Sequence, residues 1–351
     1  MKGLRLTGIL ATGHGLNDLV AGYFLGSLLG LDIGLTQIAT GLLVYNLLAF
    51  GGQYPVALWM EKVKSPRFFL ILACSVNVCA ILLFNILPHI SIVLAGFASA
   101  VYHVAGGSVC AQEKKAFHIG MFAAPGVAGL IAGGYLAHIQ IEILPVLIPV
   151  AVLFLFIMMR IRIHYPAEES PEVSGNKTRW LPDQHDVIMI LLLTVISLRS
   201  AVWHIFQLMH EENYTWLISI AVAAFAGKII GGWIADRVGW KLYTMVSLLI
   251  SAPLITLCKN QVILFCIGVG LLQSGIPATT ALMIQSVKGN RGRGIALSFG
   301  AAIVLGGFFL HWPVKFFLLS DVGTLGVLGF MGLLMYWYSR NKRGFQGVGV
   351  T

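Results

Sequence analysis

His14 and Asp18 lie four positions apart in a long apolar stretch near the start of the chain. On a helix this spacing places both side chains on one face. Asp18 can then hold the imidazole in one tautomer, and a carboxyl group in low-dielectric surroundings takes up a proton more readily than in water. This chemistry suits a proton-coupled carrier. The alternative is a static His–Asp pair that only fixes helix packing.

His103, beside Tyr102 in another apolar stretch, is the third candidate. We predict that it completes a proton relay with His14 and Asp18, unless it is simply hydrogen-bonded to a neighbouring helix. Two imidazoles and a carboxylate also form a ligand set for Zn²⁺ or Fe²⁺. A divalent metal carrier is therefore the alternative function, although Arg199 would repel a cation. No cofactor is expected.

Arg199 lies in the middle of a later apolar stretch, where its permanent charge cannot be neutralised. Trp203 follows one helical turn further on. A fixed guanidinium beside an aromatic ring suits an anionic substrate that is held bidentately. The alternative is a structural ion pair with Asp18.

Lys228 lies eight residues before Asp236, about 12 Å along a helix. Its amine either faces the interior or reaches back to the membrane interface. Tyr45 and Asn46 are further polar residues that we expect to line a substrate cavity, although each is also a candidate for bonding helix to helix. Ionisable groups in apolar spans are functional candidates by default, because burying them is costly.

The elements that must position these residues are membrane helices. The chain has 351 residues, of which 58% are hydrophobic and 11% charged, with a mean hydropathy of +0.86. A soluble domain carries about 25% charged residues. Spans of about 20 apolar residues are expected at 5–29, 35–60, 67–87, 90–110, 116–138, 143–160, 187–207, 215–235, 242–258, 261–283, 294–312 and 322–339. The sequence therefore predicts an all-α protein with twelve transmembrane helices.

A polar stretch rich in proline and charge divides the chain into a six-helix bundle over 1–160, a linker over 161–186 and a second bundle over 187–351. Of the 23 Lys and Arg, all but four fall on one side of the membrane if both termini are cytoplasmic. This asymmetry predicts that orientation. The net charge of +9 thus belongs to scattered short loops, which excludes nucleic acid as a partner.

A repeat supports the division into halves. Glu61-Lys62 follows the second span, and a longer run from Gly227 to Lys241 follows the eighth. The acidic residue of the second run, Asp236, lies half the chain length after Glu61. Equal halves with matching loops predict two parallel bundles with a site between them. The second run resembles the loop signature of the major facilitator superfamily. The resemblance implies a gating motif made of Gly227, Gly231, Asp236, Arg237, Gly239 and, in the degraded first copy, Glu61.

A narrower resemblance covers most of the first half. The segments 13–18, 96–103, 120–134 and 198–200 are similar to helices one, four, five and seven of the fosmidomycin-resistance-like branch. The sequence departs from the branch at Val104-Ala105, where Pro-Glu is usual, and at Gly30, where a proline is usual. The lost glutamate removes one titratable group from the expected proton route.

This resemblance implies proton-coupled export of a small polar or anionic organic compound, in exchange for protons, by alternating access. The expected partners are that small molecule, protons and the lipid bilayer. A monomer in a bacterial inner membrane is expected. The sequence contains no H-E-x-x-H or G-x-S-x-G motif, so no enzymatic activity is predicted.

Overall fold

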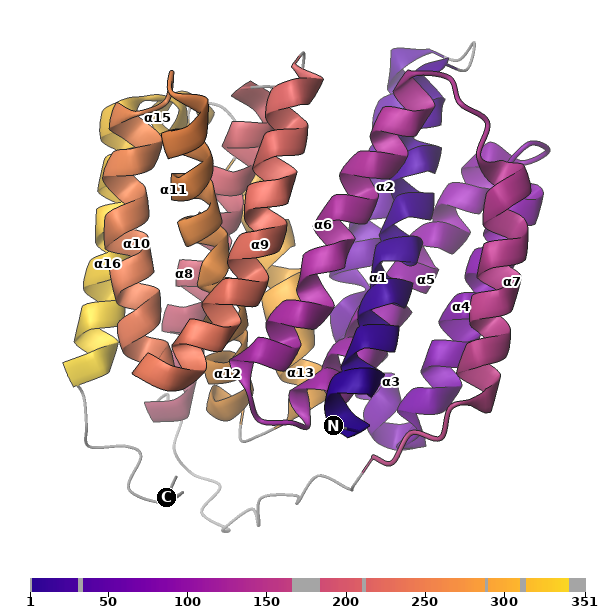
Figure 1. Cartoon of the computed structure of the whole chain (residues 1–351), viewed down its shortest axis with the longest axis horizontal. Helices are drawn as coiled ribbons and strands as arrows, with labels where there is room; N and C mark the ends of the chain where they lie inside the picture. The colour runs from indigo at the N-terminus through magenta and orange to yellow at the C-terminus, as the bar shows by residue number, and fades with distance from the viewer. Residues whose placement is uncertain are drawn as a thin grey trace.

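The computed structural model describes residues 2–30, 34–165, 184–209, 213–287, 290–309 and 314–340 (Figure 1). In these ranges the regular secondary structure is helical, and there is no strand. The first half comprises α1 (Lys2–Ser27), the 3₁₀ turn η1 (Leu28–Gly30), α2 (Leu35–Asn46), the π-helical η2 (Leu47–Gly51), α3 (Gln53–Val63), α4 (Pro66–Leu83), α5 (Pro88–Ala111), α6 (Ala116–His138) and α7 (Leu144–Arg160).

The second half comprises α8 (Gln184–Met209), α9 (Tyr214–Val238), α10 (Trp240–Leu257), α11 (Val262–Ser274), α12 (Ile276–Ser286), α13 (Arg291–Ile295), the π-helical η3 (Ala296–Ala301), α14 (Ala302–Phe308), α15 (Val314–Leu319) and α16 (Asp321–Arg340). The predicted linker falls mostly outside the described residues, so the domain boundaries stay predictions.

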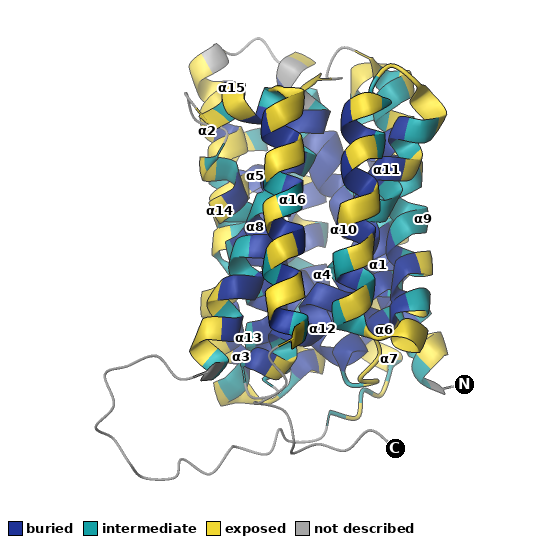
Figure 2. Ribbon diagram, turned by 90° about the vertical axis from the view of Figure 1, so that its left-hand side faces the viewer, coloured by how far each residue is buried: buried dark blue, intermediate teal, exposed yellow. Residues whose placement is uncertain are grey.

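The twelve-helix prediction is confirmed. Within the described ranges, eight helical segments are long and apolar enough to cross a membrane, with α11 and α12 counted as one segment. The other four spans are α1, the interrupted helix α2–η2–α3, the shorter apolar α7 and the interrupted helix α13–η3–α14. The outer faces of α10 and α16 are exposed (Figure 2) and carry large apolar side chains such as Leu249 and Leu333, as a lipid-facing surface requires.

Local sequence explains where several helices start and stop. Ser65 caps α4 by accepting a hydrogen bond from the Phe68 N–H, and Asn213 caps α9 in the same way through Trp216. Gly239 has a φ of 96° at the sharp junction between α9 and α10, a conformation that glycine adopts without steric cost. This glycine of the predicted gating motif therefore allows the turn.

Each half contains one π-helical segment, and the two segments lie at a contact between the halves. The segment η2 interrupts the second span, and η3 interrupts the eleventh. The spans meet there: a methyl group on Gly300 would clash with the Phe50 carbonyl, and the Gln53 amide donates to the Phe299 carbonyl at 3.3 Å. The π-helix is rare and is often found at functional sites.

Glycine packing brings α1 and α6 into close contact. A methyl group on Gly129 or Gly133 would clash with the backbone carbonyls of Gly15 or Leu19. Small residues let two membrane helices approach at backbone distance. This contact sets the positions of His14 and Asp18 on α1 relative to α6.

The two halves pack against each other at the end of the bundle where α3 and α9 end and α6 begins (Figure 1). We call it the basic end, because it carries Lys62, Lys115 and Arg237.

Candidate functional site

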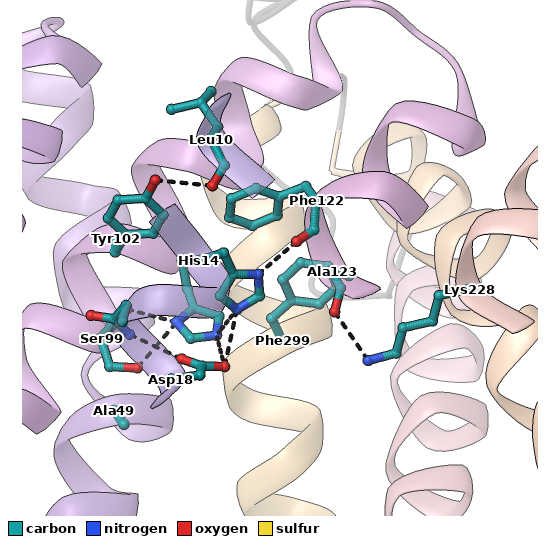
Figure 3. A network of polar contacts seen from close by, with 12 residues as sticks. Leu10, His14, Asp18, Ala49, Ser99, Tyr102, Phe122, Ala123, Lys228 and Phe299 are labelled. Atoms are coloured by element: carbon teal, nitrogen blue, oxygen red, sulfur yellow. Dashed lines mark hydrogen bonds and ion pairs between the residues drawn. The ribbon is translucent and has the colours of Figure 1, made fainter. Parts of the chain in front are cut away.

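In the first half, His14 and Asp18 lie side by side on α1 (Figure 3). The structure brings them together with His103 of α5. All three side chains are buried. The His14 Nε2 lies 2.8 Å from the His103 Nε2 and 3.2 Å from the Asp18 Oδ2. The His103 Nε2 lies 4.0 Å from the same oxygen. We call these residues the triad.

Backbone carbonyls fix the protonation pattern of both imidazoles. The His14 Nδ1 lies 2.7 Å from the Phe122 carbonyl oxygen, and the His103 Nδ1 lies 2.7 Å from the Ser99 carbonyl oxygen. A carbonyl only accepts, so each Nδ1 carries the hydrogen. A neutral imidazole has one N–H, and each Nε2 then presents a lone pair. Two lone pairs at 2.8 Å repel, whereas one added proton makes an N–H···N hydrogen bond between them.

Hydrogen bonds hold the Asp18 carboxylate in a position to stabilise a protonated imidazole. The Asn17 amide donates to Oδ1 at 2.9 Å, and the Asn77 amide donates to Asn17 at 3.3 Å. Oδ2 is therefore turned toward the imidazoles, where it stabilises the imidazolium that the proton creates. Gly126 leaves the space: a Cβ there would lie 2.6 Å from both the Asp18 Oδ2 and the His14 Nε2. Sequence reasoning gave Asn17 no role, although it adjoins Asp18.

The same three residues offer ligand atoms within 4.8 Å of one another. A tetrahedral Zn²⁺ with Zn–N distances of about 2.05 Å would hold two nitrogens about 3.3 Å apart. The observed separation of 2.8 Å between the Nε2 atoms is that of a direct hydrogen bond. The arrangement therefore fits a shared proton better than a metal ion.

The remaining first-half candidates differ in their placement. Tyr45 is buried on α2 and its hydroxyl interacts with Ser99, which also contacts His103. Asn46 is exposed, and its amide donates to the Leu42 carbonyl of its own helix at 2.9 Å. The structure therefore places Tyr45 beside the triad but does not join Asn46 to it.

Arg199 and Lys228 are buried in the second half, on α8 and α9. The Arg199 guanidinium donates to the Thr279 hydroxyl at 3.1 Å, and the Lys228 amine donates to the Ala123 carbonyl at 3.3 Å. Within the described ranges, neither cation has a carboxylate within ion-pair distance. The ion pair with Asp18 considered for Arg199 is not formed, and the Lys228 amine does not reach the interface. Trp203 is half-buried one turn from Arg199.

A short stretch of α6 separates the triad from Lys228 (Figure 3). Phe122 and Ala123 are adjacent, and their carbonyls accept hydrogen bonds from His14 and Lys228 respectively. Pro125 lies inside α6, and a proline weakens the hydrogen bonding of the preceding turn because it lacks an N–H. A methyl group on Gly120 would clash with the Lys228 carbonyl. This glycine therefore lets α9 pack closely against α6.

Two acidic residues join the halves at the basic end. The Glu61 carboxylate accepts from Arg293 at 2.6 and 2.7 Å and from the Asn290 amide at 2.9 Å. The hydrogen bond from Arg293 holds the pKa of Glu61 below its usual value. Asp236 accepts from the backbone N–H groups of Ala116 at 2.8 Å and Phe117 at 3.0 Å. Its carboxylate thus caps the start of α6.

These contacts are related by the repeat. Glu61, which follows the second span, holds the start of the eleventh, and Asp236, which follows the eighth, holds the start of the fifth. Arg237 stacks on Trp233 of its own helix, with its guanidinium carbon 3.3 Å from the ring centre. A methyl group on Gly227 would clash with Gly270, and one on Gly231 with Ser274. Both glycines therefore pack α9 against α11.

No protein family profile matches the chain, and no curated protein sequence matches it significantly. Solved structures of transporters do match. The major facilitator superfamily transporter FucP in the outward conformation has a TM-score of 0.74 at 12% identity, covering 96% of this chain and 98% of that chain. The human organic anion transporter TETRAN has a TM-score of 0.62 at 11% identity, covering 95% and 100%.

A bacterial homologue of the iron transporter ferroportin in the outward-facing state has a TM-score of 0.60 at 13% identity, covering 95% of this chain and 99% of that chain. The narrower resemblance to the fosmidomycin-resistance-like branch is not confirmed by these matches and stays a prediction. At such identities the likeness shows the fold alone. The chain is an integral membrane protein with the twelve-helix fold of the major facilitator superfamily transporters.

Proposed function

We propose that this protein is a proton-coupled secondary transporter of a small polar or anionic organic compound, working by alternating access. One observation carries the proposal. Two buried imidazoles with anchored Nδ1 hydrogens face each other at 2.8 Å beside a carboxylate. This arrangement has a place for one added proton.

The proton state of the triad is tied to helix positions. His14 belongs to α1 and His103 to α5. When the triad holds its proton, an N–H···N bond joins the helices beside the Asp18 carboxylate. When the proton leaves, two lone pairs face each other and the rings must separate or rotate. Proton release therefore changes how α1 and α5 pack, which is what a coupling site requires.

Arg199 and Lys228 are the proposed substrate anchors. Both are buried cations, and neither has a carboxylate within ion-pair distance in the described part of the chain. A substrate anion would supply the missing counter-charge, with bidentate hydrogen bonds from Arg199 and an apolar contact with Trp203. Tyr45 is the proposed link between the triad and the substrate on the first-half side.

Alternating access would use the contacts of Glu61 and Asp236. If the basic end is cytoplasmic, as the distribution of lysine and arginine predicts, these contacts close the cytoplasmic side, and the described conformation faces outward. Opening that side requires both contacts to break. The resemblance to the fosmidomycin-resistance-like branch implies export in exchange for protons.

The test replaces Asp18 with asparagine, which keeps its shape and removes its charge. The substrate is first chosen from small organic anions that raise the thermal stability of the purified protein. In proteoliposomes, Asp18→Asn is expected to abolish transport driven by a proton gradient while leaving substrate counterflow, which needs no net proton movement. Asp321→Asn, at an exposed ion pair with Lys259, is the matched control. Proton-driven flux of the wild-type size in Asp18→Asn would refute the proposal.

A divalent metal carrier is the second candidate, because the three ligand atoms of the triad converge within 4.8 Å. Calorimetry with Zn²⁺ and Fe²⁺ distinguishes the two. Stoichiometric metal binding that is lost in His103→Gln, together with no response to organic anions, would favour the metal carrier. The expected result is no stoichiometric metal binding.

A further inference from the structure

The interior of the bundle has an uncompensated positive charge. In the described part of the chain, the buried side chains away from the ends that are charged in their ordinary ionisation state are Arg199, Lys228 and Asp18. They sum to one positive charge, and the proton of the triad adds a second. His118, also buried, lies near the basic end and is bonded to Thr7. Without the proton, a bound monoanion would bring the net charge of the interior to zero. With the proton bound, the interior carries two positive charges, and a bound monoanion would reduce them to one.

Lys228 is near enough to the proton site for their charges to interact. Lys228 lies within electrostatic range of Arg199, Asp18 and His103. It is also bonded to the Ala123 carbonyl, next to the Phe122 carbonyl that holds His14 (Figure 3). Unit charges about 10 Å apart at an effective dielectric constant of 20 change each other's binding about 15-fold. A charge placed at either site therefore changes affinity at the other.

The sign of this interaction follows from the charges. A bound anion attracts a proton to the triad, and a bound proton attracts the anion. We infer that the substrate anion and the proton bind together and are carried in the same direction, as a symporter does. This inference rests on the proposed function and replaces the exchange with protons that the resemblance implies. Under an inward proton gradient such a carrier takes up its substrate.

Other ionisable groups around the triad do not reverse the attraction between the bound anion and the proton. Besides the triad itself, the neighbouring ionisable side chains in the described ranges are Tyr45 on α2, Tyr102 on α5 and Lys228 on α9. The Tyr102 hydroxyl donates to the Leu10 carbonyl at 2.9 Å, and that of Tyr45 interacts with Ser99. Lys228 is thus the neighbouring cation that disfavours a proton on the triad. A bound anion would offset this repulsion.

The first test measures protons when an anion binds. Acetate, L-lactate, succinate and inorganic phosphate are titrated into the purified protein near neutral pH, in two buffers of different ionisation enthalpy. The difference in heat gives the number of protons taken up or released. Uptake of a proton with the anion is expected. Release of a proton, or binding with no proton change, would overturn the inference while leaving transport of an anion intact.

The second test needs no substrate, because removing the Lys228 charge imitates the effect of a bound anion on the triad. Proton release from His14 and His103 is followed by nitrogen NMR of histidine-labelled protein, with His14→Gln used for assignment. In Lys228→Met the midpoint for proton release is expected about one pH unit higher, a tenfold change in proton affinity. Lys228→Arg, which keeps the charge, and Lys62→Met, at an exposed lysine, should leave the midpoint in place.

An unchanged or lower midpoint in Lys228→Met would overturn the inference. If Lys228→Met does not fold, Lys228→Gln removes the same charge with a polar side chain and is expected to raise the midpoint in the same direction. If no anion binds to the wild-type protein while the midpoint rises as expected, the proposed substrate class fails but the electrostatic link between the sites stands. The two failures are thereby distinguished.

Discussion

Neutralising the two acidic residues of the basic end should open it. Asp236 accepts from two backbone N–H groups at the start of α6, and asparagine has one acceptor oxygen for the two. Asp236→Asn therefore loses one hydrogen bond between the halves and the favourable interaction of a charge with a helix start. Because Asp236 is exposed, we take about 1 kcal/mol for this loss.

Glu61→Gln loses the charge that Arg293 binds with two hydrogen bonds. This pair is partly exposed, so about 1 kcal/mol is again appropriate. Asp236 and Glu61 share no partner, and their effects should add. The double variant is then shifted by about 2 kcal/mol, or about 30-fold, toward the state with the basic end open.

Single-molecule FRET measures this shift directly. Dyes are placed at Val63 and Val238, which are exposed at the basic end on the two halves, in a background whose five cysteines are replaced. The population with a long distance should rise in each single variant and further in the double variant. Asp321→Asn at the opposite end is the control. If the double variant matches this control, the carboxylates do not hold the basic end closed.

Two further predictions concern the basic end and the triad. Because the Arg293 hydrogen bond lowers the pKa of Glu61 from its usual 4.5, the contribution of Glu61 to closure should be complete above about pH 4.5 and be lost as the pH falls further. The same FRET pair should show opening in acid that Glu61→Gln lacks, and identical acid responses would contradict this role. Gly126→Ala should uncouple transport from protons, because the added methyl group would lie 2.6 Å from the Asp18 Oδ2 and the His14 Nε2. Gly134→Ala, on the same helix with its nearest neighbour atom at 3.8 Å, should retain coupling, and equal coupling ratios in the two variants would refute the steric argument.

The fold was predictable because its signal is local. Each span is a continuous apolar run, and a bilayer admits few other structures. The spacing of His14 and Asp18 also reports a shared helix face from sequence alone. Contacts between helices distant along the chain have no such signal. The Phe122 and Ala123 carbonyls cannot be recognised as hydrogen-bond partners until α6 is placed between α1 and α9.

The basic end illustrates the same limit. The loop signature marks Asp236, but its partners in the other half are backbone N–H groups, which every residue type except proline provides. Glu61 stands in a copy of the signature that is degraded in sequence, yet it forms an ion pair between the halves, with Arg293 at 2.6 Å. The interaction depends on Arg293, whose distance from Glu61 along the chain gives no indication of contact.

The paired π-helical segments have a consequence for the faces that their spans present. A π turn accommodates an extra residue, and one residue rotates the rest of a helix by about 100°. In the second span, Tyr45 precedes η2 and Glu61 follows it. The extra residue lets one continuous span direct Tyr45 toward the triad and Glu61 toward Arg293. In an uninterrupted helix, the angle between these two side chains about the helix axis would differ by about 100°. The span thereby serves both the proton site and the closure of the basic end.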